Sequence, residues 1–346
     1  MRTFFTMLMK KSALIILCLF SQIIFSQKLE TKILLKDKIS IRALQLYDGK
    51  VWYSGTDSKF GYVSLRDTAD KKQLKLSEKN LQFRTLGQDQ NAFYAINIES
   101  PAYFFKIDKK SLNSKIVFTD TAKTAFYDAL HFSNDGFGFA LSDPNGKEAA
   151  TSSLKTGGKL WQKCPASCLP EFKTGEAAFA ASNTNIASSK KQMWFATGGL
   201  SSRIFRQNIK SCGWEVFDTP FIQGTSSQGI YSIDFYDDKF GIAVGGDYTK
   251  QAENINNIAT THDGGETWQI QASGKNAGYK TCVKIRPKSK GKDIIAVGDQ
   301  NIEFSSDYGK TWTKISDEKG LYVCEWLDKN TLIFAGKDRI VKMTLR

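Results

Sequence analysis

The chain has 346 residues, enough for two average domains or for one large closed β architecture. Aromatic residues make up 12% of it, and 27 glycines stand against 6 prolines. This composition excludes a disordered chain and is typical of many short strands joined by tight turns. The formal net charge is +13, with the lysines scattered among acids.

The N-terminus is predicted to be an export signal over residues 1–26. A basic start precedes an apolar run over 12–25, which is short for a membrane span and is followed by polar residues. Met9 is an alternative start, and an uncleaved anchor is the alternative to cleavage. Cys18 follows a leucine, a poor fit to a lipoprotein cleavage site. We therefore expect an exported mature domain over 27–346, in the periplasm or outside the cell, with no transmembrane segment after cleavage.

The mature domain is expected to stay basic. Residues 1–26 contain three basic residues and no acid, so removing them changes the net charge from +13 to +10. Outside the cytoplasm, this charge favours an anionic polymer, a membrane surface or an acidic protein over nucleic acid as a partner.

Five cysteines follow the predicted signal, and export permits disulfides. An odd count leaves at least one thiol free. The predicted pool for a bridge is Cys164, Cys168 and Cys212, which lie in neighbouring repeats. Cys282 and Cys324 lie in apolar strand patterns and are predicted to be buried thiols.

A repeat dominates the rest of the chain, with units beginning roughly every 40–60 residues. Seven segments alternate apolar and polar residues and then reach a small-residue run: IRALQLYDGKVWYSGTD, FRTLGQDQNAFYAIN, YDALHFSNDGFGFALSD, TNIASSKKQMWFATGG, IYSIDFYDDKFGIAVGGD, KTCVKIRPKSKGKDIIAVGD and LYVCEWLDKNTLIFAGKD. Each unit is predicted to form four strands, the pattern of a β-propeller blade.

The expected fold is all-β, a seven-bladed β-propeller, with six or eight blades as alternatives. The last unit ends after its third strand, and the segment over 28–36 can supply the missing outer strand and close the ring. Closure would hide sheet edges that otherwise promote aggregation.

Two turns share a hydroxyl-x-Asp-x-Gly-x-Thr-Trp pattern, THDGGETW over 261–268 and SSDYGKTW over 305–312. The Asp is expected to accept backbone N–H bonds, the Gly to take positive φ, the Thr to begin the next strand and the Trp to pack between blades. The positions are Asp263, Gly265, Thr267, Trp268, Asp307, Gly309, Thr311 and Trp312. Degenerate copies, TGGKLW and KSCGW, favour a structural role over a shared ligand site.

These turns resemble the Asp-box, or BNR, repeats of sialidases, sortilin-type propellers and photosystem II assembly factors. Nearly all of the mature chain, including SIRAL, AFYDAL, GEAAFAASNTNIA, FDTPFIQG and GIYSIDFYDDKFGIAVGGD, resembles an exported Bacteroidetes family of BNR propellers. The resemblance implies a fold similar to that of the photosystem II assembly factor. Members of that family often carry the label "oxidoreductase".

The residues give little support to either enzyme class that the resemblance implies. The chain has two histidines, His131 and His262, too few for a His-rich metal site. It shows no Gly-x-Gly-x-x-Gly between a strand and a helix and no Cys-x-x-Cys, so no cofactor is expected. A sialidase-type Arg-Ile-Pro motif is replaced by Arg42-Ala43-Leu44, which puts glycosidase chemistry in doubt.

The candidate ligand site is the channel mouth, where the inner strands begin. The corresponding positions are Arg42, Arg84, Asp128, Asn185, Tyr231, Thr281 and Tyr322. Glu176 joins them from a small-residue insertion over 175–185, which is expected to fold over one face. The alternative is that these groups only line a water-filled channel. Gly-x-Asp turns after the second strands place Asp57, Asp143, Asp247 and Asp338 in equivalent sites, and there a structural turn is favoured over a cation site.

The sequence thus predicts a monomeric, non-catalytic binding or assembly platform for an exported protein segment or an envelope glycan. A channel-mouth enzyme, either an oxidoreductase or a sialidase-like glycoside hydrolase, is the alternative.

Overall fold

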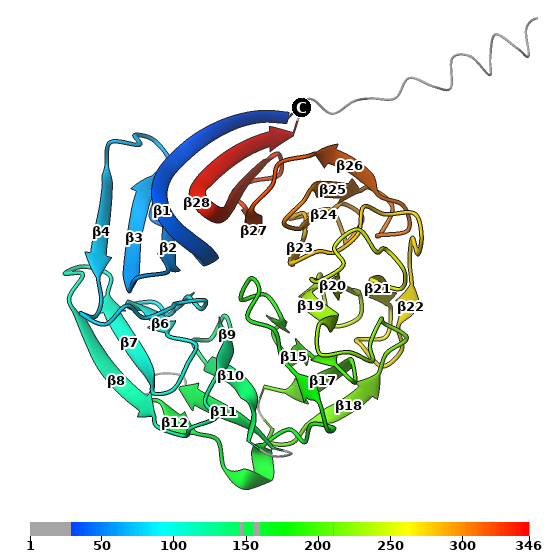
Figure 1. Ribbon diagram of the computed structural model, residues 1–346, viewed down its shortest axis with the longest axis horizontal. Helices are drawn as coiled ribbons and strands as arrows, with labels where there is room; N and C mark the ends of the chain where they lie inside the picture. Colours follow the sequence, from blue (N-terminus) through cyan, green and yellow to red (C-terminus); the bar gives the residue numbers. More distant parts are fainter. Residues whose placement is uncertain (1–28, 146–147, 155–159, 210, 346) are drawn as a thin grey trace, which may run out of the picture.

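The fold is a β-propeller, in which small antiparallel sheets are arranged around a common axis (Figure 1). It is seen in a computed structural model that describes residues 29–145, 148–154, 160–209 and 211–345. Within these residues the structure has strands and a single short 3-10 helix, η2 (Ala166–Cys168). The predicted signal over 1–26 lies outside the described residues.

Hydrogen bonding groups the strands into six sheets. Four sheets have four strands each. The first two contain β5 (Gly87–Gln88), β6 (Ala92–Ile96), β7 (Ala102–Asp108) and β8 (Ser114–Asp120), and then β9 (Tyr127–Phe132), β10 (Gly138–Asn145), β11 (Glu148–Leu154) and β12 (Gln162–Lys163). The other two contain β14 (Ile186–Ser188), β15 (Gln192–Ala196), β17 (Arg203–Asn208) and β18 (Glu215–Asp218), and then β23 (Cys282–Ile285), β24 (Ile294–Val297), β25 (Ile302–Ser305) and β26 (Thr313–Ser316). Two have six strands: β27 (Leu321–Trp326), β28 (Thr331–Leu345), β1 (Leu29–Tyr47), β2 (Lys50–Gly55), β3 (Lys59–Ser64) and β4 (Lys71–Lys75); β13 (Glu176–Ala177), β16 (Gly198–Gly199), β19 (Gln228–Phe235), β20 (Gly241–Asp247), β21 (Ile258–Thr261) and β22 (Gln269–Ile270).

The all-β propeller is confirmed, but the prediction of seven separate blades is wrong, because the described strands form six sheets. The long strands β1 and β28 each pair on both sides, so the first and last predicted units become one continuous sheet. The strand expected to close a separate seventh blade is therefore part of this shared sheet.

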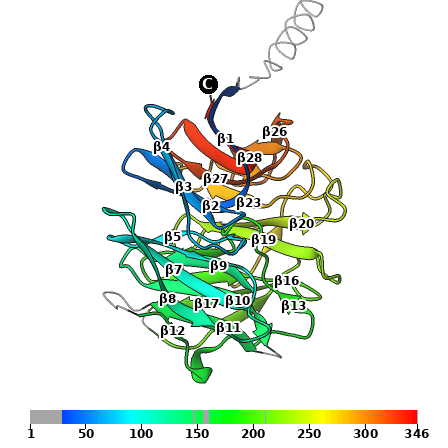
Figure 2. The same cartoon turned by 60° about the vertical axis from the view of Figure 1, so that its left-hand side comes forward.

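The two ends of the described chain lie side by side in that sheet (Figures 1 and 2). β1 pairs antiparallel with β28 from Leu29↔Leu345 to Ser40↔Lys337. Leu34 and Leu35 of β1 are buried in the largest apolar cluster of the described residues. Pairing and burial together satisfy the backbone of both strands and remove their apolar side chains from water.

Apolar side chains fill the spaces between neighbouring sheets. Trp194 of β15 stacks on Phe235 of β19, with ring centroids 3.9 Å apart and an interplanar angle of 7°. Trp268 meets the same Phe235 ring edge-on at 6.1 Å. Strands such as β20 are buried along their whole length, which explains their near-continuous apolar sequence.

The two Asp-box turns have the same hydrogen bonds. In the first, Asp263 Oδ1 accepts from the Thr267 N–H at 2.9 Å, and Trp268 Nε1 donates to the Gly265 carbonyl at 3.0 Å. Gly265 has φ +92°, a conformation that favours glycine. Its counterpart uses Asp307, Thr311, Trp312 and Gly309, with distances of 2.9 Å for both bonds and a Gly309 φ of +82°. Both tryptophans are buried, so these turns act as scaffold.

The cysteines divide between one bridge and three thiols. Cys168 forms a disulfide with Cys212, within the predicted pool, and Cys164 is free and partly buried. Cys282 and Cys324 are free and fully buried, as predicted. In the part of the chain that the structure describes, no helix has the length and apolarity needed to cross a membrane.

Candidate functional site

Residues 178–185, which belong to the insertion predicted over 175–185 and are here called the plug, occupy the centre of the propeller. In Figure 1 it is the green loop before β15 that projects into the middle of the ring. Its small side chains leave the backbone accessible: the Ala181 carbonyl accepts from Arg42 Nη1 at 3.0 Å and the Ala180 carbonyl from Arg84 Nη1 at 3.4 Å. The plug therefore uses as donors one arginine of β1 and one from the segment just before β5.

Three further predicted mouth residues contact the plug itself or an arginine that binds it. The Tyr231 ring stacks on Phe179 of the plug, with centroids 4.0 Å apart and planes inclined by 1°. The Thr281 carbonyl accepts from the Ser182 hydroxyl at 2.6 Å. The Tyr322 ring lies under the Arg42 guanidinium, 4.2 Å from it.

The structure thus brings together Arg42, Arg84, Tyr231, Thr281 and Tyr322, but their partners are protein groups.

The next plug residues bind Leu130 of β9, Ser232 of β19 and Leu86, which lies just before β5. Asn183 Nδ2 donates to the carbonyls of Leu86 at 3.0 Å and Leu130 at 3.1 Å, while Asn183 Oδ1 accepts from the Leu130 N–H at 2.8 Å. Thr184 Oγ1 lies 2.7 Å from the Ser232 hydroxyl. Because these partners come from separate sheets, the plug ties the sheets together around the axis.

Asp128, beside the plug, and Asn185, the last residue of the plug, are fully buried. Burial, and then the neighbouring Asp143 carboxyl, raise the pKa of Asp128 well above its ordinary value. Burial raises the pKa of Asp143 to about 6. Two buried carboxyls in contact cannot both ionise cheaply, and this favours the neutral form of Asp128. The Asn185 amide has no hydrogen-bond partner within the described chain.

The Gly-x-Asp sites are not equivalent. Asp143 takes part in this carboxyl pair and also accepts the Ala178 N–H at 3.2 Å. Asp247 Oδ1 accepts the Thr249 N–H at 2.9 Å, and Asp57 and Asp338 have positive φ, as turn residues do.

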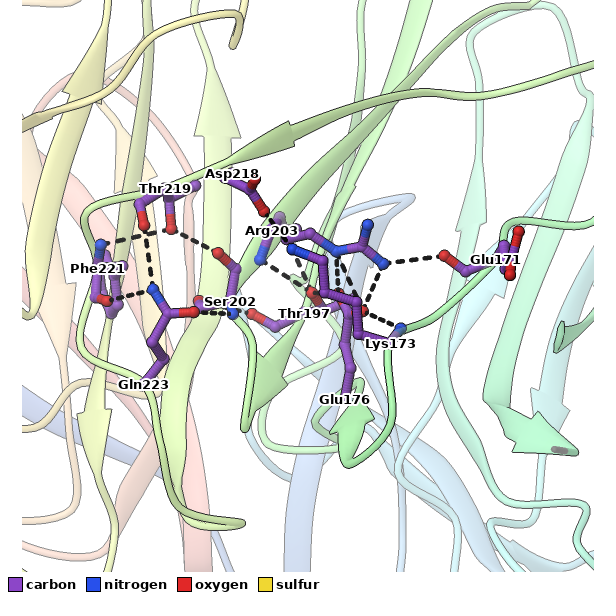
Figure 3. A network of polar contacts seen from close by, with 10 residues as sticks. All are labelled: Glu171, Lys173, Glu176, Thr197, Ser202, Arg203, Asp218, Thr219, Phe221 and Gln223. Carbon is purple, nitrogen blue, oxygen red and sulfur yellow. Dashed lines mark hydrogen bonds and ion pairs between the residues drawn. The ribbon is translucent and has the colours of Figure 1, made fainter. Parts of the chain in front are cut away.

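Glu176 lies away from the plug's contacts, in a buried ion pair with Arg203 (Figure 3). Its carboxylate accepts from Arg203 Nε at 3.0 and 3.1 Å and from Arg203 Nη2 at 2.5 Å. The Thr197 hydroxyl and the Lys173 N–H complete its shell at 2.5 and 2.7 Å. With every oxygen engaged, this carboxylate serves the packing of β13 and β16 against β17.

A cavity of about 970 Å³ lies further along the same inner strands. Ser182, Asn183 and Thr184 are part of its lining, so the plug forms one of its walls. Seven polar side chains of the inner strands line it and are here called the polar ring: Gln45, Gln88, His131, Ser188, Asp234, Lys284 and Glu325. Concave sites of this volume are where proteins usually bind ligands.

Neighbouring members of the polar ring hydrogen bond in pairs. Gln88 Nε2 donates to Gln45 Oε1 at 2.9 Å, and His131 Nε2 lies 2.7 Å from the Ser188 hydroxyl.

Lys284 and Glu325 form the charged pair of the polar ring, with Lys284 Nζ 2.7 Å from Glu325 Oε2 and the side chains 22% and 36% exposed. Burial alone would lower the pKa of Lys284, but the charges of Glu325 and Asp234 outweigh it and raise the pKa. Lys284 is therefore firmly cationic.

The lining is acidic, although the chain is basic. It contains Asp89, Asp135, Asp234 and Glu325 against Lys106 and Lys284, four carboxylates and two ammonium groups. Asp234 accepts the Ile285 N–H at 2.7 Å and the Phe235 N–H at 3.0 Å, which fixes its position.

Sequence reasoning missed the polar ring, although a signal was present. Charged residues interrupt otherwise apolar inner strands in YSIDFY, TCVKIR and YVCEWL, a few positions after the mouth residues that were chosen. A charge in a buried strand needs a partner or a cavity. Among the described residues, no group of three or more His, Cys, Asp or Glu side chains could hold a metal ion.

Comparison with known proteins supports the class defined by the sheets. No family model matches the chain. No curated protein matches it either. Many solved structures do. YCF48 bound to D1 peptide is 14% identical, with a TM-score of 0.63, over 92% of this chain and 97% of that chain. A streptogramin B lyase is 14% identical, with a TM-score of 0.66, over 92% and 98%. The WD40 repeats of RRP9 are 11% identical, with a TM-score of 0.64, over 92% and 98%.

At these identities the likeness establishes the fold alone, a β-propeller. The predicted similarity in fold to the photosystem II assembly factor is confirmed by YCF48. Membership of the exported Bacteroidetes BNR family stays a prediction.

Proposed function

We propose that this protein is an exported, non-catalytic binding platform whose cavity accepts a protein segment carrying a cationic group. The observation that carries the proposal is the lining of the cavity, with four carboxylates against two lysines. A lysine, arginine or N-terminal ammonium of the partner would complete the charge balance beside Asp234 and Glu325. The Cys168–Cys212 disulfide supports a location outside the cytoplasm.

The positive charge of the whole chain does not oppose such a ligand strongly. Exposed charges more than about 8–10 Å apart are largely screened at physiological ionic strength, whereas partly buried charges in a cavity are screened much less. The local carboxylates therefore decide which ligand enters. A hydrogen bond to a charged group contributes about 1.5–3 kcal/mol, enough for specificity.

A propeller of this fold with a bound peptide has a precedent in YCF48 bound to D1 peptide. The fold also supports catalysis, as in streptogramin B lyase. The plug favours binding at the polar ring, because the other end of the channel already has Arg42 and Arg84 engaged by plug carbonyls.

The test is to select linear peptides from a display library on the immobilised full chain. We expect enrichment of Lys or Arg, and at least about a tenfold rise in Kd for a selected peptide with Glu325→Gln. Asp317→Asn removes an exposed carboxylate, 76% accessible, which does not line the cavity, and should leave Kd unchanged.

Two results would overturn the proposal. One is selection of peptides without basic residues, or equal binding by the Glu325→Gln variant. The other is saturable binding of a neutral oligosaccharide that displaces the selected peptide, which would make the ligand a glycan.

A further inference from the structure

Two free thiols meet where the inner strands of neighbouring sheets face each other. Cys282 of β23 and Cys324 of β27 have their Sγ atoms 3.9 Å apart, and Cys282 Sγ lies 3.8 Å from the Cys324 carbonyl oxygen. A disulfide bond is about 2.05 Å long, so the sulfurs would have to approach by about 1.9 Å. Closing that gap requires rotation about the two Cα–Cβ bonds.

The two thiols differ in their surroundings. Burial alone would raise the pKa of Cys282, but a hydrogen bond with Cys324 and the nearby Lys284 ammonium outweigh it, so the pKa falls below its usual 9.0. Burial, and then Cys282, raise the pKa of Cys324 well above that value. Because the thiolate is the reactive form, these directions favour Cys282 as the nucleophile and Cys324 as the resolving thiol.

The position of the pair restricts what can react with it. Both cysteines are 0% exposed, but Cys324 and Lys284 line the cavity. A bulky disulfide cannot reach a fully buried sulfur in the folded chain. Hydrogen peroxide is close to water in size and can approach the pair from the cavity on the side of Cys324, since Cys282 is not part of the lining.

We infer that Cys282 and Cys324 form a redox-active dithiol, which hydrogen peroxide oxidises to a disulfide joining β23 and β27. The Cys282 sulfur attacks one peroxide oxygen and the O–O bond breaks, giving a sulfenic acid and one water. The Cys324 sulfur then attacks the Cys282 sulfur and the S–O bond breaks. The departing hydroxide takes the Cys324 proton and leaves as a second water. The two thiols lose two electrons, and these reduce one peroxide to two waters.

This inference is independent of the proposed ligand and is tested on the full chain. The folded, reduced protein is treated with hydrogen peroxide, unfolded with N-ethylmaleimide and digested without reductant for mass spectrometry. We expect a linked Cys282–Cys324 peptide, with loss of alkylation at these two cysteines. Alkylation of Cys164, a partly buried thiol outside the pair, is measured in the same sample for comparison. Full alkylation of both, or oxidation to sulfinic acid without a link, would overturn the inference.

Variants test the order of the steps. Cys324→Ser should stop at a Cys282 sulfenic acid, and Cys282→Ser should leave Cys324 reduced. Cys164→Ser should leave the cross-link unchanged. The assigned roles would be overturned if Cys324 in the Cys282→Ser variant were oxidised as fast as Cys282 in the Cys324→Ser variant. Because the wild-type measurement needs no substitution, a variant that folds poorly does not affect the main test.

Discussion

Asp234 and His131 belong to the same polar ring, and burial favours the neutral form of both. Burial raises the pKa of Asp234 to about 6, with the charge of Lys284 partly opposing the shift. Burial lowers the pKa of His131 to about 4, and the charge of Lys284 adds to that shift. A carboxyl and an imidazole thus exchange their usual order of titration. In the range from pH 5 to 7, Asp234 is the member of this pair whose charge changes.

Binding of a cationic peptide should therefore weaken as the pH falls. Below about pH 6 the Asp234 carboxyl is protonated and loses its attraction for the cation, so Kd should rise about tenfold between pH 7 and pH 5. Asp234→Asn should bind more weakly at pH 7 and show little further change. His131→Gln should keep the pH dependence. Titrations by fluorescence anisotropy will check this, and a pH dependence lost with His131→Gln would contradict it.

At the scale of elements, the plug takes the place that a solvent-filled channel would have. Its backbone can come close to Arg42 and Arg84 because it is rich in alanine. Asn183 has φ +59°, a conformation that asparagine tolerates better than most residues. From there its side chain makes three hydrogen bonds, with Leu130 of β9 and with Leu86, which lies just before β5. The strands β5 and β9 belong to separate sheets.

Removing the Asn183 amide should destabilise the whole propeller. Three hydrogen bonds at about 0.5–1.5 kcal/mol each predict a loss of about 2–4 kcal/mol for Asn183→Gly, which tolerates the positive φ. Asn183→Ala should cost about 1 kcal/mol more, because its Cβ disfavours that φ. Denaturant unfolding measures both. Asn113→Ala, in an exposed turn, is the control. Equal stability of Asn183→Gly and the wild type would show that the plug does not hold the sheets.

At the scale of the molecule, the sequence predicted what depends on near neighbours. Strand alternation and the Asp-box turns are local, since Asp263 bonds Thr267 only four residues away. The number of sheets is not local, because it depends on pairing between β1 and β28 at opposite ends of the chain. The partner of Glu176 was equally hard to predict, since Arg203 lies 27 residues further along the chain, beyond β14, β15 and β16. For the same reason the candidate site lies further along the inner strands than the sequence predicted. The position of the plug depends on tertiary contacts, which a local sequence pattern does not show.

The join between the chain ends makes the whole molecule depend on the first strand. Residues 29–36 pair with β28 over Arg339–Leu345, and they bury Leu34 and Leu35. Burying each leucine contributes about 1.5–3 kcal/mol, so a chain beginning at residue 37 should lose about 3–6 kcal/mol relative to one beginning at residue 29. It would also expose the edge of β28, which promotes aggregation.

A peptide of residues 29–36 added to the shortened chain should restore the denaturation midpoint by strand addition, and a scrambled peptide should not. If the two chains unfold at the same denaturant concentration and the peptide has no effect, β28 does not require β1. The stability of the propeller would then not depend on the pairing of β1 with β28.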